Sequence, residues 1–193
     1  MLAHYHAQVW NGSELARSFG ISQTSVRRYL DILTDTLVIK QLQPWHENLS
    51  KRQVKAPKIY LDDAGLLHNL LGIETLQNLT MHPKVGASWE GFIIQIIIRQ
   101  LNARPEQCYF WASYSGAEID LLIVRGQEKW AFEIKRTTTP KTTKSMHESI
   151  QSLGLDRLYL IHAGEKDFML AENIQALSLS GSFKHFLNFQ PSP

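Results

Sequence analysis

Polar and apolar residues alternate along two short runs of the chain, residues 118–124 (EIDLLIV) and 129–136 (KWAFEIKR), on either side of the glycine-containing sequence RGQE. Alternation with a period of two is typical of a half-buried strand, and a short polar turn between two such runs predicts a β-hairpin. In the second run the large apolar side chains share one face, so Glu133 and Lys135 share the other. The pattern therefore predicts a hairpin with charged residues on one face.

The register of this hairpin brings two acids together. A turn centred on Gly126 and the residue after it sets Val124 opposite Lys129 and, further along, Asp120 opposite Glu133. Directly opposed side chains lie about 5 Å apart, and two carboxylates at this distance repel by about 3 kcal/mol at an effective dielectric constant of about 20. We therefore expect another group to offset this repulsion.

A divalent cation is the group that would offset it best. Mg²⁺ or Mn²⁺ accepts carboxylate oxygens as ligands and completes its coordination with water. Lys135 lies two residues beyond Glu133 on the same face. The set Asp120, Glu133 and Lys135 therefore predicts metal-assisted cleavage of a phosphodiester, with Lys135 positioning water or stabilising the developing charge. The alternative is a solvated face on which these three residues pair with their neighbours.

The amino-terminal third predicts two helices separated by a tight turn. Ser13 is the expected N-cap of the first helix (ELARSF), Gly20 the turn, and Ser22 the N-cap of the second helix (QTSVRRYLDILTDT). The apolar residues expected on one side of the second helix are Val26, Tyr29, Leu30 and Leu33. This pattern is typical of a helix-turn-helix.

The residues that follow predict two strands around a basic loop, which makes a winged helix-turn-helix over residues 1–62. The second helix is expected to present Gln23, Thr24, Arg27 and Arg28 outward, and the basic residues around the loop are Lys51, Arg52, Lys55 and Lys58. Such a domain reads a DNA groove with its second helix and contacts phosphates from the wing. We therefore expect DNA contact through Arg27, Arg28, Lys51, Arg52 and Lys55. A protein-docking role, or a loop that is merely solvated, is the alternative.

The middle of the chain predicts helices, with breaks near Gly72 and at the sequence HPKVG. Ser88 is the expected N-cap of a helix that begins at Trp89, which puts Glu90 in the first turn. The helix dipole favours an acid there for structural reasons alone. The functional interpretation is that Glu90 is a third carboxylate delivered to the hairpin.

The remainder predicts a mixed sheet. Ser145 and Glu148 have the spacing of a capping box, so we expect a helix over 146–153 that ends at Gly154. The sequences RLYLIHAG and FMLAENIQALSL are expected to be strands. A strand, a helix and a strand in succession predict a crossover between parallel strands, so residues 63–193 are expected to form an α/β domain with a mixed sheet.

Composition and charge narrow the class of protein. The 193 residues include one cysteine, which excludes an intramolecular disulfide, fits a reducing compartment and gives no support for a zinc cluster. Residues 1–60 hold eight Lys or Arg against four acids, whereas residues 61–193 hold twelve against fourteen. The sequence contains neither a signal-peptide pattern nor an apolar run long enough to span a membrane, so we expect a cytoplasmic protein. It also lacks the G-x-x-x-x-G-K-[ST] phosphate loop, so no ATPase activity is expected on this chain.

The order of the acids resembles the PD-(D/E)XK nuclease superfamily. The residues that carry the resemblance are those of WEGF, GAEIDLLI and FEIKR, with twelve residues between Asp120 and Glu133. The resemblance implies a restriction-endonuclease-like α/β domain in which Glu90, Asp120 and Glu133 bind Mg²⁺ or Mn²⁺ and Lys135 assists catalysis. Glu118 is an alternative ligand to Asp120, because it points to the same face two residues earlier.

Nearly the whole chain is also similar to a carboxy-terminal domain of unknown function (DUF4143 type) of bacterial and archaeal AAA-type ATPases. The stretch from SQTSVRRYL to AGLLHNLLG carries this resemblance together with the three short motifs. It implies a P-loop ATPase partner, in cis or in trans, and a Met1 that is the native start or a fragment boundary. The expected function is a magnesium-dependent DNA nuclease-like module. The alternative is a catalytically inactive regulatory or protein-interaction domain of the ATPase, and transcriptional regulation by the winged helix ranks last.

Overall fold

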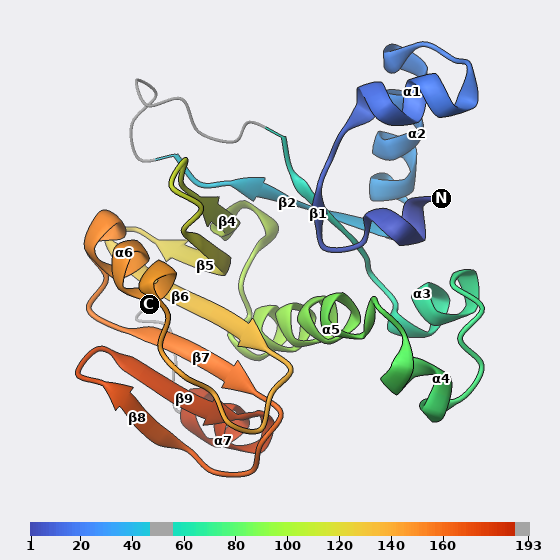
Figure 1. Ribbon diagram of the computed structural model, residues 1–193. Coiled ribbons are helices and arrows are strands. Elements are labelled where there is room, and N and C mark those ends of the chain that lie inside the picture. Colours follow the sequence, from blue (N-terminus) through green and yellow to red (C-terminus); the bar gives the residue numbers. More distant parts are fainter. Residues whose placement is uncertain (47–55, 188–193) are drawn as a thin grey trace. The chain divides into compact units, whose positions relative to one another are not determined.

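The computed structural model describes residues 1–46 and 56–187 and has an α/β architecture with a large mixed sheet and, among these residues, seven α-helices (Figure 1). The described residues divide into two units. The first takes residues 1–43 and 56–91, and the second takes residues 44–46 and 92–187. The domain boundary predicted after residue 62 stays a prediction.

The first unit is built around three short antiparallel strands in the order β1-β3-β2. Its elements are the 3₁₀ helix η1 (Leu2–Tyr5), β1 (Gln8–Val9), α1 (Gly12–Phe19), α2 (Gln23–Asp35), β2 (Ile39–Pro44), β3 (Lys58–Leu61), α3 (Ala64–Leu70), α4 (Leu76–Met81) and the beginning of α5 (Val85–Gln100). The two helices and the two strands that follow them appear in the predicted order.

The turn between α1 and α2 confirms part of the helix-turn-helix prediction. Gly20 has a φ of 66° and ends α1, and the Ser22 side chain accepts a hydrogen bond from the Ser25 amide at 3.1 Å, so Ser22 is the N-cap of α2. The predicted N-cap Ser13 is wrong. Asn11 caps α1 instead, and Ser13 lies inside the helix that begins at Gly12.

The buried side of α2 is narrower than predicted. Val26 and Leu30 are buried and Leu33 is half-buried, but Tyr29 is 61% exposed. Val26 packs with Leu15 of α1. The covered stripe therefore follows Val26 and Leu30, and Tyr29 lies at its solvent margin.

The two strands predicted after α2 are confirmed, since β2 pairs antiparallel with β3. Lys58 was wrongly assigned to the basic loop. It lies on β3, is 6% exposed, and its Nζ is 3.7 Å from a carboxylate oxygen of Glu90. A lysine is stable in such a place because an acid pairs with it. The other predicted loop cations, Lys51, Arg52 and Lys55, lie outside the described residues.

The predicted breaks in the middle of the chain are confirmed, but the start of the long helix is not. Gly72 has a φ of 68° after α3, and residues 82–84 separate α4 from α5. Helix α5 begins at Val85 rather than Trp89. Ser88 is already helical, and its hydroxyl lies 2.7 Å from Nε2 of His68 instead of capping the helix. Glu90 therefore lies beyond the first turn, where the helix dipole gives no special reason for an acid.

The second unit contains a six-stranded mixed sheet in the order β4-β5-β6-β7-β9-β8. Its elements are the rest of α5, the 3₁₀ helix η2 (Pro105–Gln107), β4 (Cys108–Ala112), β5 (Glu118–Arg125), β6 (Glu128–Lys135), α6 (Lys144–Leu153), β7 (Leu158–His162), β8 (Phe168–Ala171), β9 (Ile174–Ser178) and α7 (Leu179–Phe186). The β6–β7 and β7–β9 pairs are parallel and the others are antiparallel. The mixed sheet and the parallel crossover through α6 are as predicted.

The hairpin register is also as predicted, with Val124 opposite Lys129 and Leu121 opposite Phe132. The last predicted strand, by contrast, is a β-hairpin. Residues 168–171 form β8 and residues 174–178 form β9, which pair antiparallel. The break falls at Glu172 and Asn173, polar residues of the kind that form turns.

Helix α6 begins earlier than predicted. Thr143 is its N-cap and accepts a hydrogen bond from the Met146 amide at 3.3 Å, so the capping box of Ser145 and Glu148 is wrong. Gly154 ends the helix with a φ of 61°, as predicted. Ser145 does not cap the helix, because its hydroxyl accepts a hydrogen bond from the backbone amide of Glu118 on β5.

Helices cover both faces of the sheet of the second unit (Figure 1). On one face, Met146 and Leu153 of α6 pack among buried residues of β5, β6 and β7. On the other face, Phe186 of α7 packs edge-to-face on Phe132 and Tyr159. No helix within residues 1–46 and 56–187 is long and apolar enough to cross a membrane.

Candidate functional site

Two acids lie side by side inside the sheet of the second unit. Asp120 is the third residue of β5 and Glu133 the sixth of β6, and they are only 6% and 5% exposed. The β5–β6 register pairs Leu121 with Phe132, and the next position in the same register sets Asp120 opposite Glu133. The Asp120 carboxylate accepts a hydrogen bond from the Ile134 amide at 2.8 Å, which ties it to the strand that carries Glu133.

Glu133 has an unusual electrostatic environment. One carboxylate oxygen, Oε1, lies 2.7 Å from Nζ of Lys135, but no described residue donates a hydrogen bond to the buried Oε2. Burial, followed by the negative charge of Asp120, raises the pKa of Glu133 from 4.5 to about 8, although Lys135 opposes the shift. Without a cation, the carboxyl group is therefore mostly protonated at neutral pH.

Lys135 connects this buried pair to solvent. Its side chain is 48% exposed, while the Glu133 side chain that it contacts is 7% exposed. On the neighbouring strand its register partner is His162, whose ring accepts from the Gly164 amide and lies 3.0 Å from the carbonyl of Lys166. Lys135 is thus the charged group through which the acids meet the surface.

Glu118 lies two residues before Asp120 and is half-buried. Its charge raises the pKa of Glu133 further, as the smallest of the contributions. The structure therefore joins Asp120, Glu133 and Lys135 in one cluster, with Glu118 beside them.

Glu90 belongs to the first unit, where it has its own partners. It accepts a hydrogen bond from the hydroxyl of Tyr60 at 2.7 Å and pairs with the buried Lys58. Its role as a metal ligand stays a prediction.

The predicted DNA-contacting residues of α2 are exposed. Gln23, Thr24, Arg27 and Arg28 all face solvent, as expected. Arg27 is also paired with Asp31 at 3.0 Å, one helical turn away. DNA contact by these side chains stays a prediction.

The acid pair fits a small hard cation. Within residues 1–46 and 56–187, no group of three or more His, Cys, Asp or Glu side chains is arranged to hold a metal ion. Mg²⁺, however, is commonly bound by one or two carboxylates, with water and substrate phosphate as its other ligands. Two adjacent buried carboxylates, one with an unsatisfied oxygen, are such a donor set. Asp120 and Glu133 therefore suit Mg²⁺ or Mn²⁺.

A group of polar contacts around α6, which the sequence does not predict, fixes the strand that carries Asp120. The Ser145 hydroxyl accepts from the Glu118 amide at 3.1 Å, and the Ser149 hydroxyl donates to the Glu118 carbonyl at 3.5 Å. Glu148 accepts hydrogen bonds from Ser113 and Ser115 on the turn before β5. The spacing of four between the two helical serines is a signal that could have indicated one shared face.

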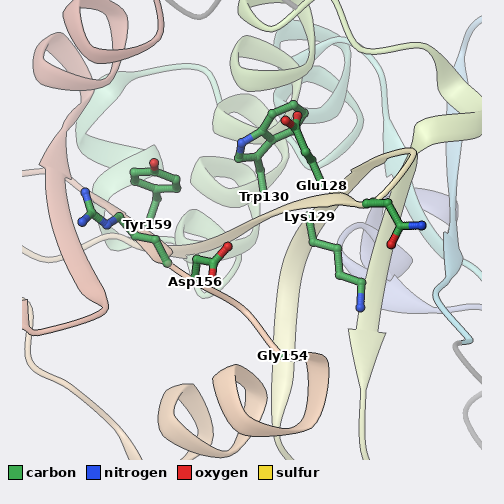
Figure 2. Close-up of a pocket in the computed structure, with 8 residues that line it drawn as sticks. Glu128, Lys129, Trp130, Gly154, Asp156 and Tyr159 are labelled. Atoms are coloured by element: carbon green, nitrogen blue, oxygen red, sulfur yellow. The ribbon is translucent and has the colours of Figure 1, made fainter. Parts of the chain in front are cut away.

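A separate pocket of about 340 Å³ lies at the other end of β6, near the starts of β6 and β7. Figure 2 shows Trp130 and Tyr159 on one side of the strands and Lys129 pointing to the other side, where Nζ donates to the Leu153 carbonyl at 3.0 Å. The pocket is lined by Gln127, Glu128, Lys129, Trp130, Gly154, Asp156, Arg157 and Tyr159. It contains neither acid of the buried pair.

The fold and the site define an α/β protein with a buried pair of acids beside a lysine at one end of a mixed sheet. Residues 85–181 match the family model of a domain of unknown function, DUF4143, and the chain belongs to this family. Residues 1–77 match a second domain of unknown function, DUF8612.

The chain also has curated relatives. The chain is similar to the uncharacterised proteins Rv2008c of Mycobacterium tuberculosis and Mb2031c of Mycobacterium bovis, at 47% identity over 177 residues in both cases. The match covers 92% of this chain but only 40% of each relative. No solved structure matches the chain.

Proposed function

We propose that the second unit is a nuclease-like domain of the PD-(D/E)XK type that hydrolyses phosphodiester bonds in DNA with Mg²⁺ or Mn²⁺. The observation that carries this proposal is the buried pair of Asp120 and Glu133, with Lys135 in contact with Glu133 at 2.7 Å. Burying two neighbouring carboxylates is costly, and a site that uses their charge gives a reason for it.

The order of elements supports the proposal. Helix α5, the antiparallel strands β4, β5 and β6, helix α6 and the parallel strand β7 follow one another as in the restriction-endonuclease-like fold. The acids occupy the second and third strands of this series. In the first unit, α1, α2 and the antiparallel strands β2 and β3 support a winged helix, for which we propose DNA engagement through Arg27 and Arg28.

Each residue has a distinct chemical part in this proposal. Asp120 and Glu133 would hold the ion, Asp120 being oriented by the Ile134 amide. A bound divalent cation supplies Lewis acidity and lowers the pKa of water. Glu133 must lose its proton to bind the ion, because its pKa is about 8 without one. Lys135, half exposed, is placed to stabilise negative charge on a phosphate.

We further propose that the chain is a module of an AAA-type ATPase, with the P-loop domain in cis or in trans. The chain spans about 40% of the length of the curated relatives it matches, which leaves room in those proteins for another domain. ATP hydrolysis would then belong to that domain.

Calorimetric titration of Mg²⁺ and Mn²⁺ into wild type and Glu133→Gln tests the metal site. We expect binding by wild type with release of about one proton below pH 8, because Glu133 must deprotonate, and none by the variant. Cleavage of single-stranded and duplex DNA by wild type and loss of cleavage in Asp120→Asn would then establish the reaction. Wild type that neither binds the ions nor cleaves DNA when they are present would refute the proposal.

The second candidate is a catalytically inactive regulatory or protein-interaction domain. It is favoured by the 2.7 Å contact between Lys135 and Glu133 and by the lack, among the described residues, of a three-residue metal-binding group. Under this proposal Asp120→Asn and Glu133→Gln leave every activity unchanged, whereas the nuclease proposal requires both to abolish cleavage.

A further inference from the structure

The segment that follows the lysine of the acidic site is strongly basic. Residues 136–144 (RTTTPKTTK) contain Arg136, Lys141 and Lys144, five threonines and no acid. Their charge of +3 exceeds the +2 of the whole chain. Positive charge is therefore concentrated here, in the half of the sequence that is acidic on balance.

These cations are available to a ligand. Arg136, Lys141 and Lys144 are all exposed. Throughout residues 1–46 and 56–187, no carboxylate forms an ion pair with any of the three. A solvated face usually carries mixed charges that partly cancel, and this segment does not.

The segment has a fixed backbone conformation. The Thr137 carbonyl accepts from the Ala163 amide at 2.9 Å, and the Thr137 hydroxyl accepts from the Thr139 amide at 3.2 Å. Pro140 is buried, and Thr143 caps α6. Because the chain is held at several points, little conformational entropy is lost when a ligand binds it.

The segment also begins and ends at the acidic site. Arg136 directly follows Lys135, at the end of β6 that lies beside the start of β5 (Figure 1). Asp120 is the third residue of β5 and accepts a hydrogen bond from the amide of Ile134, close to that end of β6. Its other end leads into α6, where Ser145 binds the amide of Glu118. A polymer whose scissile phosphate reached the acids would therefore have its neighbouring phosphates close to this segment.

We propose that residues 136–144 form a surface that binds the phosphodiester backbone of nucleic acid, without reading its sequence. Arginine, lysine and threonine hydroxyls are the groups that contact phosphates in protein–DNA complexes, and they carry no base specificity there. This inference rests on the proposed function, because it assigns the substrate contacts of the same site. It assigns the main electrostatic contact with nucleic acid to the second unit rather than to Arg27 and Arg28 of the first unit.

The test is the salt dependence of DNA binding by the full chain in EDTA, which prevents metal-dependent cleavage. Fluorescence anisotropy of a labelled duplex is compared for wild type, the triple variant Arg136→Ala, Lys141→Ala, Lys144→Ala, and a control. The control is Arg104→Ala, Arg157→Ala, Lys184→Ala, which removes three exposed cations of the same unit elsewhere. Circular dichroism and thermal unfolding establish that each variant is folded.

The slope of log affinity against log salt is negative, and we expect it to be less steep by about 2.7 in the segment variant. This is about 0.9 for each lost phosphate contact. The loss of affinity between about 50 and about 200 mM salt should then be about 40-fold smaller than in wild type. The control should retain the wild-type slope. Equal slopes for wild type and the segment variant, or an equal reduction in the control, would overturn the proposal. A competition experiment gives a further outcome that would overturn the proposal. If an acidic polypeptide displaces the labelled duplex as effectively as unlabelled DNA of the same charge, the surface suits an acidic protein instead.

This experiment separates the surface from the metal site. Loss of DNA affinity in the segment variant, in a chain whose acids bind no Mg²⁺ or Mn²⁺, would uphold the surface and refute the nuclease proposal. Intact metal binding with an unchanged salt slope would refute the surface alone.

Discussion

Removing the charge of Glu133 should stabilise the metal-free protein at alkaline pH. The pKa of this carboxyl is about 8 in the folded chain, against 4.5 for an exposed glutamate, because burial and Asp120 disfavour the charged form. A raised folded pKa gives stability that is fully present below the unfolded pKa and is lost as the pH rises towards the folded pKa. The free energy of unfolding of wild type should therefore fall by up to about 1.4 kcal/mol per pH unit between these values from this group alone.

Glu133→Gln abolishes this titration and keeps nearly the shape of the protonated acid. The advantage of the variant over wild type should grow by about 3 kcal/mol between about pH 5.5 and about pH 8.5. The loss of the Lys135 ion pair subtracts little from this advantage, because that side chain is 48% exposed.

Urea unfolding of both proteins in EDTA at the two pH values measures the effect. Comparing the two proteins at each pH cancels the titrating groups that do not interact with Glu133. A variant that is less stable than wild type at alkaline pH, or a difference that does not change with pH, would show that the carboxylate is a structural partner and that the reasoning is wrong. Saturating Mg²⁺ should then stabilise wild type by about 3 kcal/mol at about 100 times the dissociation constant and leave the variant unchanged.

Three further predictions concern the first unit. Gly91→Ala should destabilise it by about 2 kcal/mol in a thermal or urea melt, because the new methyl group would lie 2.8 Å from Cε1 of the buried His6 and closer still to Nε2. Gly86→Ala, on the same helix and with open space, is its control and should be neutral or stabilising by about 0.5 kcal/mol. Burial lowers the pKa of His6 to about 4, so the free energy of unfolding should fall by about 3 kcal/mol as the pH drops from about 6.5 to about 4, and His6→Gln should flatten that dependence in urea melts. Ser22→Ala should cost about 1 kcal/mol, since its hydroxyl caps α2, and an unchanged melting curve would contradict that role.

The sequence was sufficient for features that depend on neighbouring residues. The register of the β5–β6 hairpin follows from one glycine turn and from alternation along two strands, so Asp120 and Glu133 could be placed together before their surroundings were known. Gly20 and Gly154 ended their helices as expected, because a left-handed residue is a local requirement.

Features that depend on distant residues were predicted poorly. The partner that keeps Lys58 buried, Glu90, is more than thirty residues away along the chain, so the lysine looked like part of a solvated loop. The errors at helix starts have a related cause. Ser13, Ser88 and Ser145 all have suitable chemistry for caps, but each helix begins earlier in the chain. Ser88 and Ser145 bind groups outside their own helices instead.

The buried thiol of Cys108 allows the stability of the site's sheet to be followed without labelling. It lies at the start of β4, it is the one cysteine of the chain, and it donates a hydrogen bond to the Arg104 carbonyl at 3.3 Å. A thiol reagent can modify it only when this strand opens, so the reaction rate reports the free energy of that opening. Strand β4 pairs with β5, the strand that carries Asp120. Any ligand that locks the acidic site should therefore slow the modification of a cysteine that it never touches.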